Sequence, residues 1–310
     1  MRRISAVITL VVLSCSVFAE KFEFVAIGDT AYQGEPSIEA YARLIELINE
    51  QNIAFSIHVG DIWGASMCIE ERYEEILDTF NTYLKPVVFT PGDNEWTDCD
   101  RHAYGDWEPA DRLQVLRDVY YKEAKSLGAE TMPLVRQADV SPYTKFVENV
   151  RWLHHNVLFF TLNVPGSNNN VDIAVKSDLL EAYERNQANK AWLRDSFRIA
   201  MEQDLTAVVI AIQAELFANT GGQRVPPAYS DLVNEMRIAT SRYSKPILLV
   251  HGDAHRFTID RPFSAFGPGR LINGNFMRLQ VYGDPEVRAV RVTVDPETPW
   301  VFGFEPLYLE

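Results

Sequence analysis

The sequence predicts an α/β protein built on a parallel sheet, and two observations lead to this fold class. The first is that strand and helix patterns alternate through the first third of the 310 residues. The second is that the dipeptide Gly-Asp follows three of the predicted strands at equal intervals, at Asp29, Asp61 and Asp93. The interval is close to the length of one strand–helix–strand unit, about 30 residues. We therefore expect three parallel strands that end at the same edge of a sheet.

The individual elements follow from hydrophobic periodicity and from turn-forming residues. Apolar runs predict strands, in chain order, at residues 22–27, 55–59, 87–89, 150–152, 157–162, 207–212, 246–250, 276–282 and 287–294. Helical periodicity predicts helices at 37–48, 70–84, 109–125 and 178–203. In the first of these helices Ser37 is the expected N-cap, and the expected buried face consists of Ile38, Tyr41, Leu44, Ile45 and Ile48. The Pro, Gly, Ser and Asn residues at 165–170 indicate a loop. No linker divides these parts, so we expect residues 20–310 to form one domain.

Residues 1–19 have the pattern of a secretory signal peptide. Arg2 and Arg3 give a basic start, an apolar stretch spans 4–13, and small residues precede a cleavage point after Ala19. Because this stretch is too short to cross a membrane, we expect cleavage and a secreted or periplasmic location. The alternatives are a buried first strand or an anchor helix. Cleavage removes two arginines and no acid, which changes the formal net charge from −14 to −16.

The cleaved chain keeps two cysteines, Cys68 and Cys99, because Cys15 belongs to the predicted signal peptide. In an oxidising compartment an even number of cysteines predicts one disulfide rather than two free thiols. The two cysteines follow Asp61 and Asp93 closely along the chain. The disulfide would thus join two loops that leave the same edge of the sheet.

Composition excludes several classes of protein. Beyond Ala19 no apolar stretch approaches the length of a membrane helix, roughly 18 residues, so no membrane span is expected. A charge of −16 argues against nucleic acid as a partner, since nucleic-acid binding needs clustered Lys and Arg. A hydrophobic content of 47% argues against disorder.

The strand-end aspartates predict a metal site. Three carboxylates that converge on one crevice repel each other unless a cation or a proton lies between them. A fourth Gly-Asp pair, at Asp253, lies between His251 and His255. Mixed Asp and His ligands suit Zn, Fe or Mn better than Ca, and such a cluster suggests a two-metal hydrolase. The alternative is that the aspartates cap helices and turns and that the histidines are structural.

Taken together, these motifs resemble those of the calcineurin-like metallophosphoesterases. The resemblance spans residue 22 to the C-terminus, and it is closest to a secreted branch with divergent motifs, marked by residues 91–99, 165–169 and 251–255. It implies a four-layer α/β/β/α sandwich with two central mixed sheets. It also implies that a hydroxide held between two metal ions attacks the phosphorus of a small-molecule phosphoester. Its ligands would be Asp29 and His255 for the first metal, Asp93 for the second and Asp61 bridging both.

The sequence departs from the family pattern at four places. Ala31 stands where the family has a histidine, and Asn94 replaces the histidine that assists the leaving group. Gln213 and Asp253 replace two further histidines, although His251 lies close to the second. We predict two divalent ions (Mn, Fe, Zn or Mg) with harder ions favoured, and one of the two positions weak or empty. The predicted ligands are Asp29, Asp61, Asp93, Gln213, His251, Asp253 and His255, and the predicted catalytic residues are Asp61 and Asn94.

Two functions remain open after this comparison. The first is a metal-dependent phosphatase or phosphodiesterase. The second is a secreted binding module that keeps the fold and at most one metal but has lost catalysis. A serine hydrolase is excluded because the chain has no Gly-x-Ser-x-Gly elbow.

Overall fold

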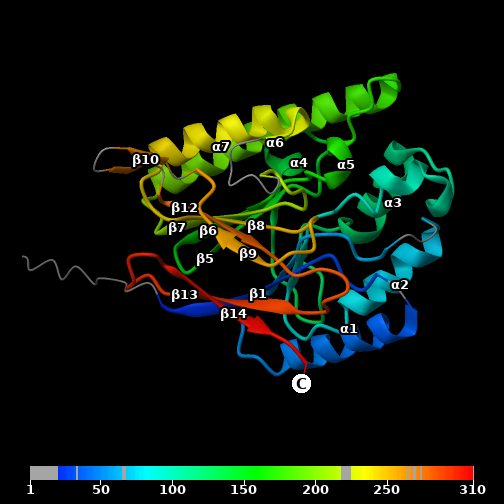
Figure 1. The fold of residues 1–310 in the computed structure, drawn as a ribbon, viewed down its shortest axis with the longest axis horizontal. Helices are drawn as coiled ribbons and strands as arrows, with labels where there is room; N and C mark the ends of the chain where they lie inside the picture. The colour runs from blue at the N-terminus through cyan, green and yellow to red at the C-terminus, as the bar shows by residue number, and fades with distance from the viewer. Residues whose placement is uncertain are drawn as a thin grey trace, which may run out of the picture.

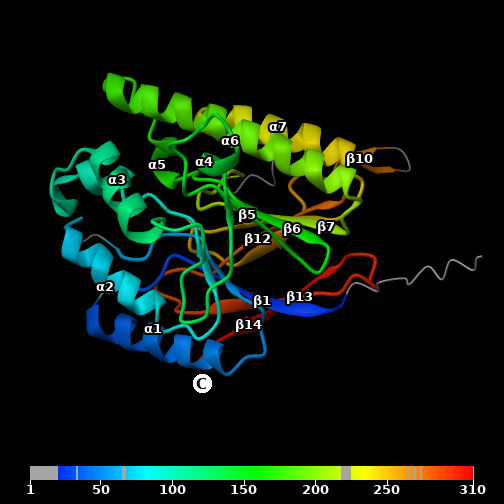
Figure 2. The same cartoon turned by 180° about the vertical axis from the view of Figure 1, so that it is seen from behind.

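The computed structural model describes residues 20–309, apart from 33, 65–67, 218–224, 264, 268–269 and 273. The predicted signal peptide lies outside the described residues. The described chain forms four layers, with two sheets packed face to face and helices on both outer faces (Figure 1). This is the α/β/β/α sandwich with two central sheets that the family resemblance implied. Figure 2 shows the same four layers from behind.

The first sheet has five strands in the order β14-β13-β1-β2-β3. Its strands are β1 (Phe22–Ile27), β2 (Ser56–His58), β3 (Val87–Phe89), β13 (Ala289–Val294) and β14 (Phe302–Leu307). β1, β2 and β3 are parallel, as the Gly-Asp spacing predicts, whereas β13 and β14 are antiparallel to their neighbours. The sheet is therefore mixed.

The second sheet has seven strands in the order β4-β5-β6-β7-β8-β12-β9. They are β4 (Val135–Arg136), β5 (Val150–His154), β6 (Val157–Thr161), β7 (Ala207–Ala211), β8 (Ile247–His251), β9 (Thr258–Asp260) and β12 (Phe276–Gln280). β6, β7, β8 and β12 are parallel, and the remaining pairings are antiparallel. A separate ribbon pairs β10 (Ala265–Gly267) with β11 (Arg270–Ile272).

The longer helices cover the outer faces of the two sheets. Those against the first sheet are α1 (Gly34–Asn49), α2 (Glu70–Phe80) and α3 (Pro109–Tyr120), and those against the second are α6 (Lys176–Glu202) and α7 (Ser230–Arg242). Short turns complete the set: α4 (Gln137–Val140), α5 (Gly166–Asn169), η1 (Thr97–Asp100), η2 (His102–Tyr104) and η3 (Pro227–Tyr229). Among the described residues, no helix combines the length and the apolar character needed to cross a bilayer.

Alternation of side chains along the strands divides the interior into three apolar cores. In β1, Phe24 and Ala26 face the space between the sheets, whereas Val25 and Ile27 face α1 and α2. Aromatic rings fill the centre of the space between the sheets: Phe24, Phe55, Trp152 and Phe159. This packing holds the two sheets in a fixed relation, so the strand ends at one edge of each sheet face each other.

Most of the predicted elements are present, but two details of α1 are wrong. The helix begins at Gly34, so Ser37 lies inside it and is not its N-cap. Pro36 lies in the first turn, where a missing N–H has little cost, and it is the better marker of the start. Ile38 is 46% exposed and lines a cleft between α1 and α2, so it does not belong to the buried face.

Further differences concern helix ends, one missed long helix and the strands that were not predicted: β4, β9, β10, β11 and β14. α2 and α3 end at Phe80 and Tyr120, several residues before the predicted ends. α7 was not expected, although apolar residues at helical spacing mark its buried face: Leu232, Val233, Met236 and Ala239. Boundaries are weakly specified by periodicity alone because the chain beyond a helix end also contributes apolar side chains to the core.

The disulfide between Cys68 and Cys99 is present, as predicted. It joins the loop after β2 to the η1 turn after β3, and both cysteines are fully buried. The sequence separation is 31 residues, and a closed loop of this size restricts the unfolded chain considerably.

Replacing both cysteines by alanine should therefore lower the free energy of unfolding by about 3 kcal/mol. Guanidinium unfolding of the oxidised wild type and of the Cys68→Ala, Cys99→Ala variant measures the difference. A reducing agent should destabilise the wild type and leave the variant unchanged. Equal stability of the two oxidised proteins would contradict the prediction.

His58 is a buried histidine at the end of β2. Its Nδ1 accepts a hydrogen bond from the Gly60 N–H at 3.3 Å. The ring packs edge-on against Phe80. Burial lowers the pKa of His58 from 6.5 to about 3.

The folded protein therefore binds fewer protons at His58 than the unfolded chain between pH 6.5 and about 3, so stability decreases as the pH falls through this range. A His58→Gln variant does not titrate there. Below pH 6 the free energy of unfolding of the wild type should therefore fall more steeply than that of the variant, by up to about 1.4 kcal/mol per pH unit. Urea unfolding at pH 7, 6 and 5 checks this, and parallel curves for the two proteins would contradict it.

Candidate metal centre

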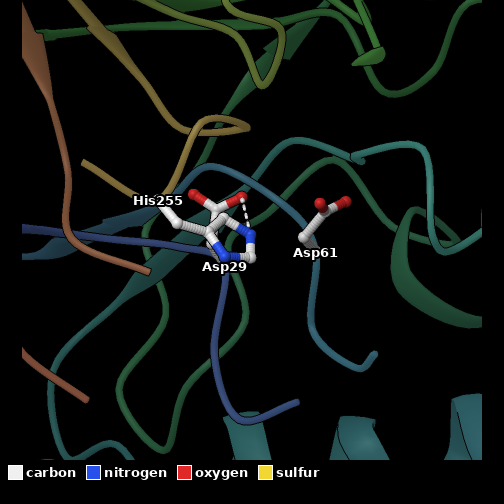
Figure 3. Close-up of side chains that lie close together, drawn as sticks. All are labelled: Asp29, Asp61 and His255. Carbon is white, nitrogen blue, oxygen red and sulfur yellow. Dashed lines mark ion pairs between the residues drawn. The ribbon is translucent and has the colours of Figure 1, made fainter. Parts of the chain in front are cut away.

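The candidate site lies where the carboxyl ends of the parallel strands of both sheets meet. Asp29 follows β1 and Asp61 follows β2, whereas His255 comes from the loop after β8 in the second sheet. Each offers one ligand atom, and these three atoms lie within 4.8 Å of one another. Figure 3 shows the carboxylate of Asp29 beside the His255 ring, with Asp61 next to them. Ligand sites in open α/β sheets occupy the same position, beyond the carboxyl ends of strands.

The backbone at the site is left-handed at four non-glycine residues. Asp29, Asp61, Asp253 and His255 have φ angles of 51°, 52°, 78° and 52°. Such angles are uncommon outside glycine, and they concentrate at functional sites where the surrounding structure holds them. At each of these positions the chain turns back sharply after a strand, so that the side chains point toward a common centre.

Glycines make room for these carboxylates. A Cβ atom at Gly92 would collide with Oδ1 of Asp61, and one at Gly252 would collide with Oδ2 of Asp29. The glycine of one Gly-Asp pair thus clears space for the aspartate of another. This mutual packing explains why the Gly-Asp pairs occur together. The local turn geometry of each single pair does not explain it.

The orientation of His255 fits a metal ligand. Its Nδ1 lies 2.9 Å from the carbonyl oxygen of Asp284, which only accepts hydrogen bonds, so Nδ1 carries the proton. Nε2 then presents a lone pair, 3.8 Å from Oδ1 of Asp29. With a neutral ring this lone pair and the carboxylate face each other favourably only around a cation, whereas a protonated ring would form an ion pair with Asp29. A hydrogen bond on the other ring nitrogen is also the usual way in which a metal-binding histidine is held.

The electrostatics of the site call for positive charge. Burial, followed by the charges of neighbouring carboxylates, raises the pKa of Asp61 well above its ordinary value. Burial also raises the pKa of Asp29, although the N–H of Asp253 counteracts this. Burial and the charge of Asp93 raise the pKa of Asp253 to about 7. Buried carboxylates that converge in this way suit divalent cations, which stabilise their ionised form.

Protein donors fix the carboxylate of Asp61 at the centre of the group. The phenol of Tyr32 donates to Oδ2 at 2.6 Å, and the Asn94 N–H donates to Oδ1 at 3.3 Å. The Tyr32 ring also packs edge-on against His255 at a centroid distance of 4.8 Å. Sequence reasoning did not find the hydroxyl contact of Tyr32 with Asp61. The only signal for it was the position of Tyr32, shortly after Asp29 in the chain.

Gln213 lies between two of the aspartates as a hydrogen-bond donor. Its Nε2 donates to Oδ2 of Asp61 at 3.1 Å and to Oδ1 of Asp93 at 3.2 Å. Its Oε1 accepts a short hydrogen bond from the Gly166 N–H, and this contact fixes which way the amide points. In this arrangement the amide oxygen faces away from the carboxylates. The ligand role of Gln213 stays a prediction that this orientation does not support.

The side chain of Asn94 organises loops and does not reach the centre of the group. Its Nδ2 donates to the carbonyl of Trp63 at 2.7 Å, and its Oδ1 accepts from Tyr104 at 3.1 Å. Only its backbone N–H contacts Asp61. The catalytic role predicted for Asn94 therefore has no geometric support, because both polar atoms of the amide have other partners.

The remaining predicted ligands lie around this group. Asp253 accepts from the Glu215 N–H at 2.8 Å, and its own N–H contacts Asp29. His251 is fully buried at the end of β8, its Nδ1 lies 3.0 Å from the carbonyl of Gly252, and burial lowers its pKa to about 3. Among the described residues it is not part of the three-residue group, so its ligand role stays a prediction. Burial keeps its ring neutral.

Glu95 is a structural residue of the site that the sequence did not identify as such. Its buried carboxylate accepts the N–H groups of Asp61 (3.2 Å), Ile62 (2.5 Å) and Gly92 (2.6 Å). It therefore ties the loop after β2 to the loop after β3. Burial, partly offset by these three hydrogen bonds, raises the pKa of Glu95 to about 7. Its place in the Gly92–Glu95 motif was the available indication.

Solved structures with the same fold support this architecture. No protein-family model matches the chain, and no curated protein is significantly similar to it. The structure of GAP50, the anchor in the inner membrane complex of Plasmodium, matches with a TM-score of 0.51 at 9% identity, over 94% of this chain and 89% of that one. A putative 5'-nucleotidase from Staphylococcus aureus matches with a TM-score of 0.52 at 14% identity, over 93% of this chain.

The match covers 54% of the nucleotidase, so this chain corresponds to about half of that protein. A dimetal phosphatase from Danio rerio also matches, with a TM-score of 0.48 at 10% identity, over 93% of this chain and 99% of that one. At these identities the likeness shows the fold alone. The chain shares its two-sheet sandwich fold with GAP50 and with the putative 5'-nucleotidase.

Replacing Glu95 by Gln should lower the free energy of unfolding by about 2 kcal/mol at pH 8, where the carboxylate is ionised, because one of the three N–H donors then faces an NH₂ group. The matched control is Glu75→Gln, which removes an exposed carboxylate paired with Arg72 and should change stability by less than about 0.5 kcal/mol. Guanidinium unfolding measures both, and equal effects would contradict the structural role of Glu95.

Proposed function

We propose that this protein is a metal-dependent phosphoester hydrolase. The observation that carries the proposal is the buried group of Asp29, Asp61 and His255 at the shared strand-end edge. Two sheets each contribute ligand atoms to this group, and it has more negative charge than its protein partners neutralise. The chemistry of the donor set, carboxylates with one imidazole, suits Mn, Fe, Zn or Mg.

The residues divide between two ion positions. Asp29 and His255 would hold the first ion, Asp93 and the neighbouring Asp253 would hold the second, and Asp61 would be shared. Two divalent ions supply Lewis-acid chemistry, in which they activate water and neutralise charge that develops on a phosphoryl group. The protein's own part is to hold the carboxylates in place, through Tyr32 and the loops around them, and to exclude bulk water from the carboxylates.

Room for the organic part of a substrate exists beside the Asp93 side of the site. A cavity of about 500 Å³ is lined by Arg101 and Ser167 among others, and Ser167 contacts Asp93 directly. Arg101 is half exposed there. The Staphylococcus aureus protein of the same fold is a putative nucleotidase, and we propose a small-molecule phosphoester as the substrate class for this chain as well.

We further propose that the protein is exported. The basic and apolar pattern of residues 1–19 motivates this, and the Cys68–Cys99 disulfide is consistent with an oxidising compartment. Mass spectrometry of the protein purified from its native compartment tests it. A mature N-terminus at Glu20 is expected, and an intact Met1 on most molecules would contradict export with cleavage.

A second candidate function is a binding module that keeps the fold and at most one ion. The orientations of Asn94 and Gln213 favour it, because neither presents a catalytic or ligating group to the centre. GAP50 of Plasmodium, which has the same fold, is described as an anchor. A protein of this fold can therefore have a role in attachment. The number of bound ions separates the two functions: two ions favour the hydrolase, and one or none favours the module.

The wild type should hydrolyse p-nitrophenyl phosphate or bis-p-nitrophenyl phosphate in the presence of Mn²⁺, Zn²⁺ or Mg²⁺. The Asp61→Asn variant should lose more than about 100-fold in kcat, since the shared carboxylate loses its charge. Its melting temperature without metal should change little, because the removal of a buried charge next to other carboxylates offsets the hydrogen bond that the amide cannot accept from Tyr32 or Asn94. Steady-state kinetics, metal analysis and thermal unfolding measure these quantities.

The matched control is Asp78→Asn, an exposed aspartate on α2, which should keep wild-type activity. If the wild type binds two ions but neither substrate turns over, the hydrolase assignment fails while the metal site stands. If the metal-equilibrated wild type binds no ion, both fail.

A further inference from the structure

Four consecutive non-glycine residues near the site have left-handed backbone angles. Ser167, Asn168, Asn169 and Asn170 have φ angles of 42°, 57°, 58° and 57°. They belong to the turn labelled α5 and its end, between β6 and α6 (Figure 1), and we call residues 167–170 the left-handed turn. Left-handed angles are unfavourable for residues other than glycine, and asparagine tolerates them best. The run of three asparagines fits this conformation. Such backbone strain persists only where the surrounding structure holds it, and it is typical of functional sites.

Arg185 of α6 holds the left-handed turn in place. Its side chain is fully buried, donates to the side chain of Asn169 at 2.6 Å and to the Asn169 carbonyl at 3.0 Å. The same guanidinium contacts the Asn163 carbonyl and lies over the Trp96 ring, 5.1 Å from its centroid. Trp96 belongs to the loop that follows Asp93. The turn is therefore clamped between α6 and the loop that bears one of the predicted metal ligands.

The left-handed turn brings a hydroxyl to Asp93. Ser167 Oγ lies 2.6 Å from Oδ2 of Asp93 and 2.6 Å from Oδ1 of Asp98. Gly166, immediately before it, packs so closely that a Cβ there would lie 2.8 Å from Oδ2 of Asp93. An ordinary right-handed turn would place the Ser167 side chain elsewhere, because the sign of φ sets the direction of the Cα–Cβ bond.

Arg101 contacts both Ser167 and Asp98, the two residues that lie next to Asp93 here. Its Nη1 forms an ion pair with Oδ2 of Asp98 at 2.5 Å, and its Nη2 donates to Ser167 Oγ at 3.0 Å. Asp98 thus already has a cationic partner, whereas the side-chain donors to Asp93 are the hydroxyl of Ser167 and the amide of Gln213. We therefore assign the single hydroxyl proton of Ser167 to Asp93, because Asp98 already has Arg101 as its partner.

We propose that Ser167 is a positioning residue, which orients the Asp93 carboxylate for the ion on the Asp93 side of the site. The left-handed turn, which Arg185 holds through its hydrogen bonds, keeps this hydroxyl in place. This inference rests on the proposed metal site. Outer partners of metal ligands typically contribute about 10- to 100-fold in metal affinity or activity, and we assign Ser167 to this class. Asn168, with its side chain directed to the Val171 carbonyl, has no such role.

The test compares two glycine variants within the same left-handed turn. Ser167→Gly and Asn168→Gly both relieve left-handed strain, because glycine adopts positive φ without a Cβ clash. Only the first removes the hydroxyl from Asp93. Calorimetric titration with Mn²⁺ and with Zn²⁺ measures the affinity and number of bound ions for both variants and the wild type, and thermal unfolding without metal measures stability.

We expect Ser167→Gly to weaken the binding of the second ion about 10- to 100-fold, to leave the first ion unchanged and to shift the melting temperature no more than Asn168→Gly does. Asn168→Gly should bind both ions as the wild type does. A merely structural Ser167 would change the melting temperature and not the affinity for the second ion, and that result overturns the inference. Two tightly bound ions in Ser167→Gly also overturn it and leave the proposed function intact. One ion or none bound to the wild type overturns both.

Discussion

Buried negative charge at the meeting edge of two sheets is the constraint on which the rest of this site depends. Asp29 and Asp61 are removed from water by the layers around them, and Asp93 and Asp253 lie beside them. Cations keep converging carboxylates in such a place ionised. Nε2 of His255, which faces Asp29, independently indicates a cation at this place. Divalent ions satisfy both requirements at once.

The scaffold holds this charge in a fixed geometry by stiffening the loops that bear it. Three apolar cores fix the two sheets relative to each other. The loops are then joined directly: Glu95 connects the loops after β2 and β3, and the disulfide does so a second time. Arg185 performs a similar task for the left-handed turn. Positive φ angles within these loops show that local backbone preference has been overridden by tertiary contacts.

The divergence from the family motifs has a structural counterpart. Where the resemblance leads one to expect imidazoles, the structure has amides: Asn94 contacts the Trp63 carbonyl and the Tyr104 hydroxyl, and Gln213 contacts the Gly166 N–H and the carboxylates of Asp61 and Asp93. Replacing imidazoles by carboxylates such as Asp253 shifts the donor set toward oxygen, which favours harder ions. A hydroxyl at Ser167 then becomes important because fewer neighbouring groups remain to orient the carboxylates.

The amino-acid sequence by itself determined β1, β2, β3 and β13 of the first sheet but not β14. It also determined the common edge of Asp29, Asp61 and Asp93 and the pairing of Cys68 with Cys99. These features depend on local periodicity, on the equal spacing of the three aspartates and on an even number of cysteines. It failed at the start of α1 and missed α7, since helix ends depend on which neighbours cover them.

Only the tertiary structure decided which atom of each side chain faces the centre. Ser167 reaches Asp93 across 74 residues of sequence, and Gln213 reaches Asp61 across 152. Such contacts depend on the relative position of two sheets and on left-handed turns that no local pattern specifies. The sequence could therefore identify the residues of the site, but the direction of an amide or of a histidine lone pair follows from partners that are distant along the chain.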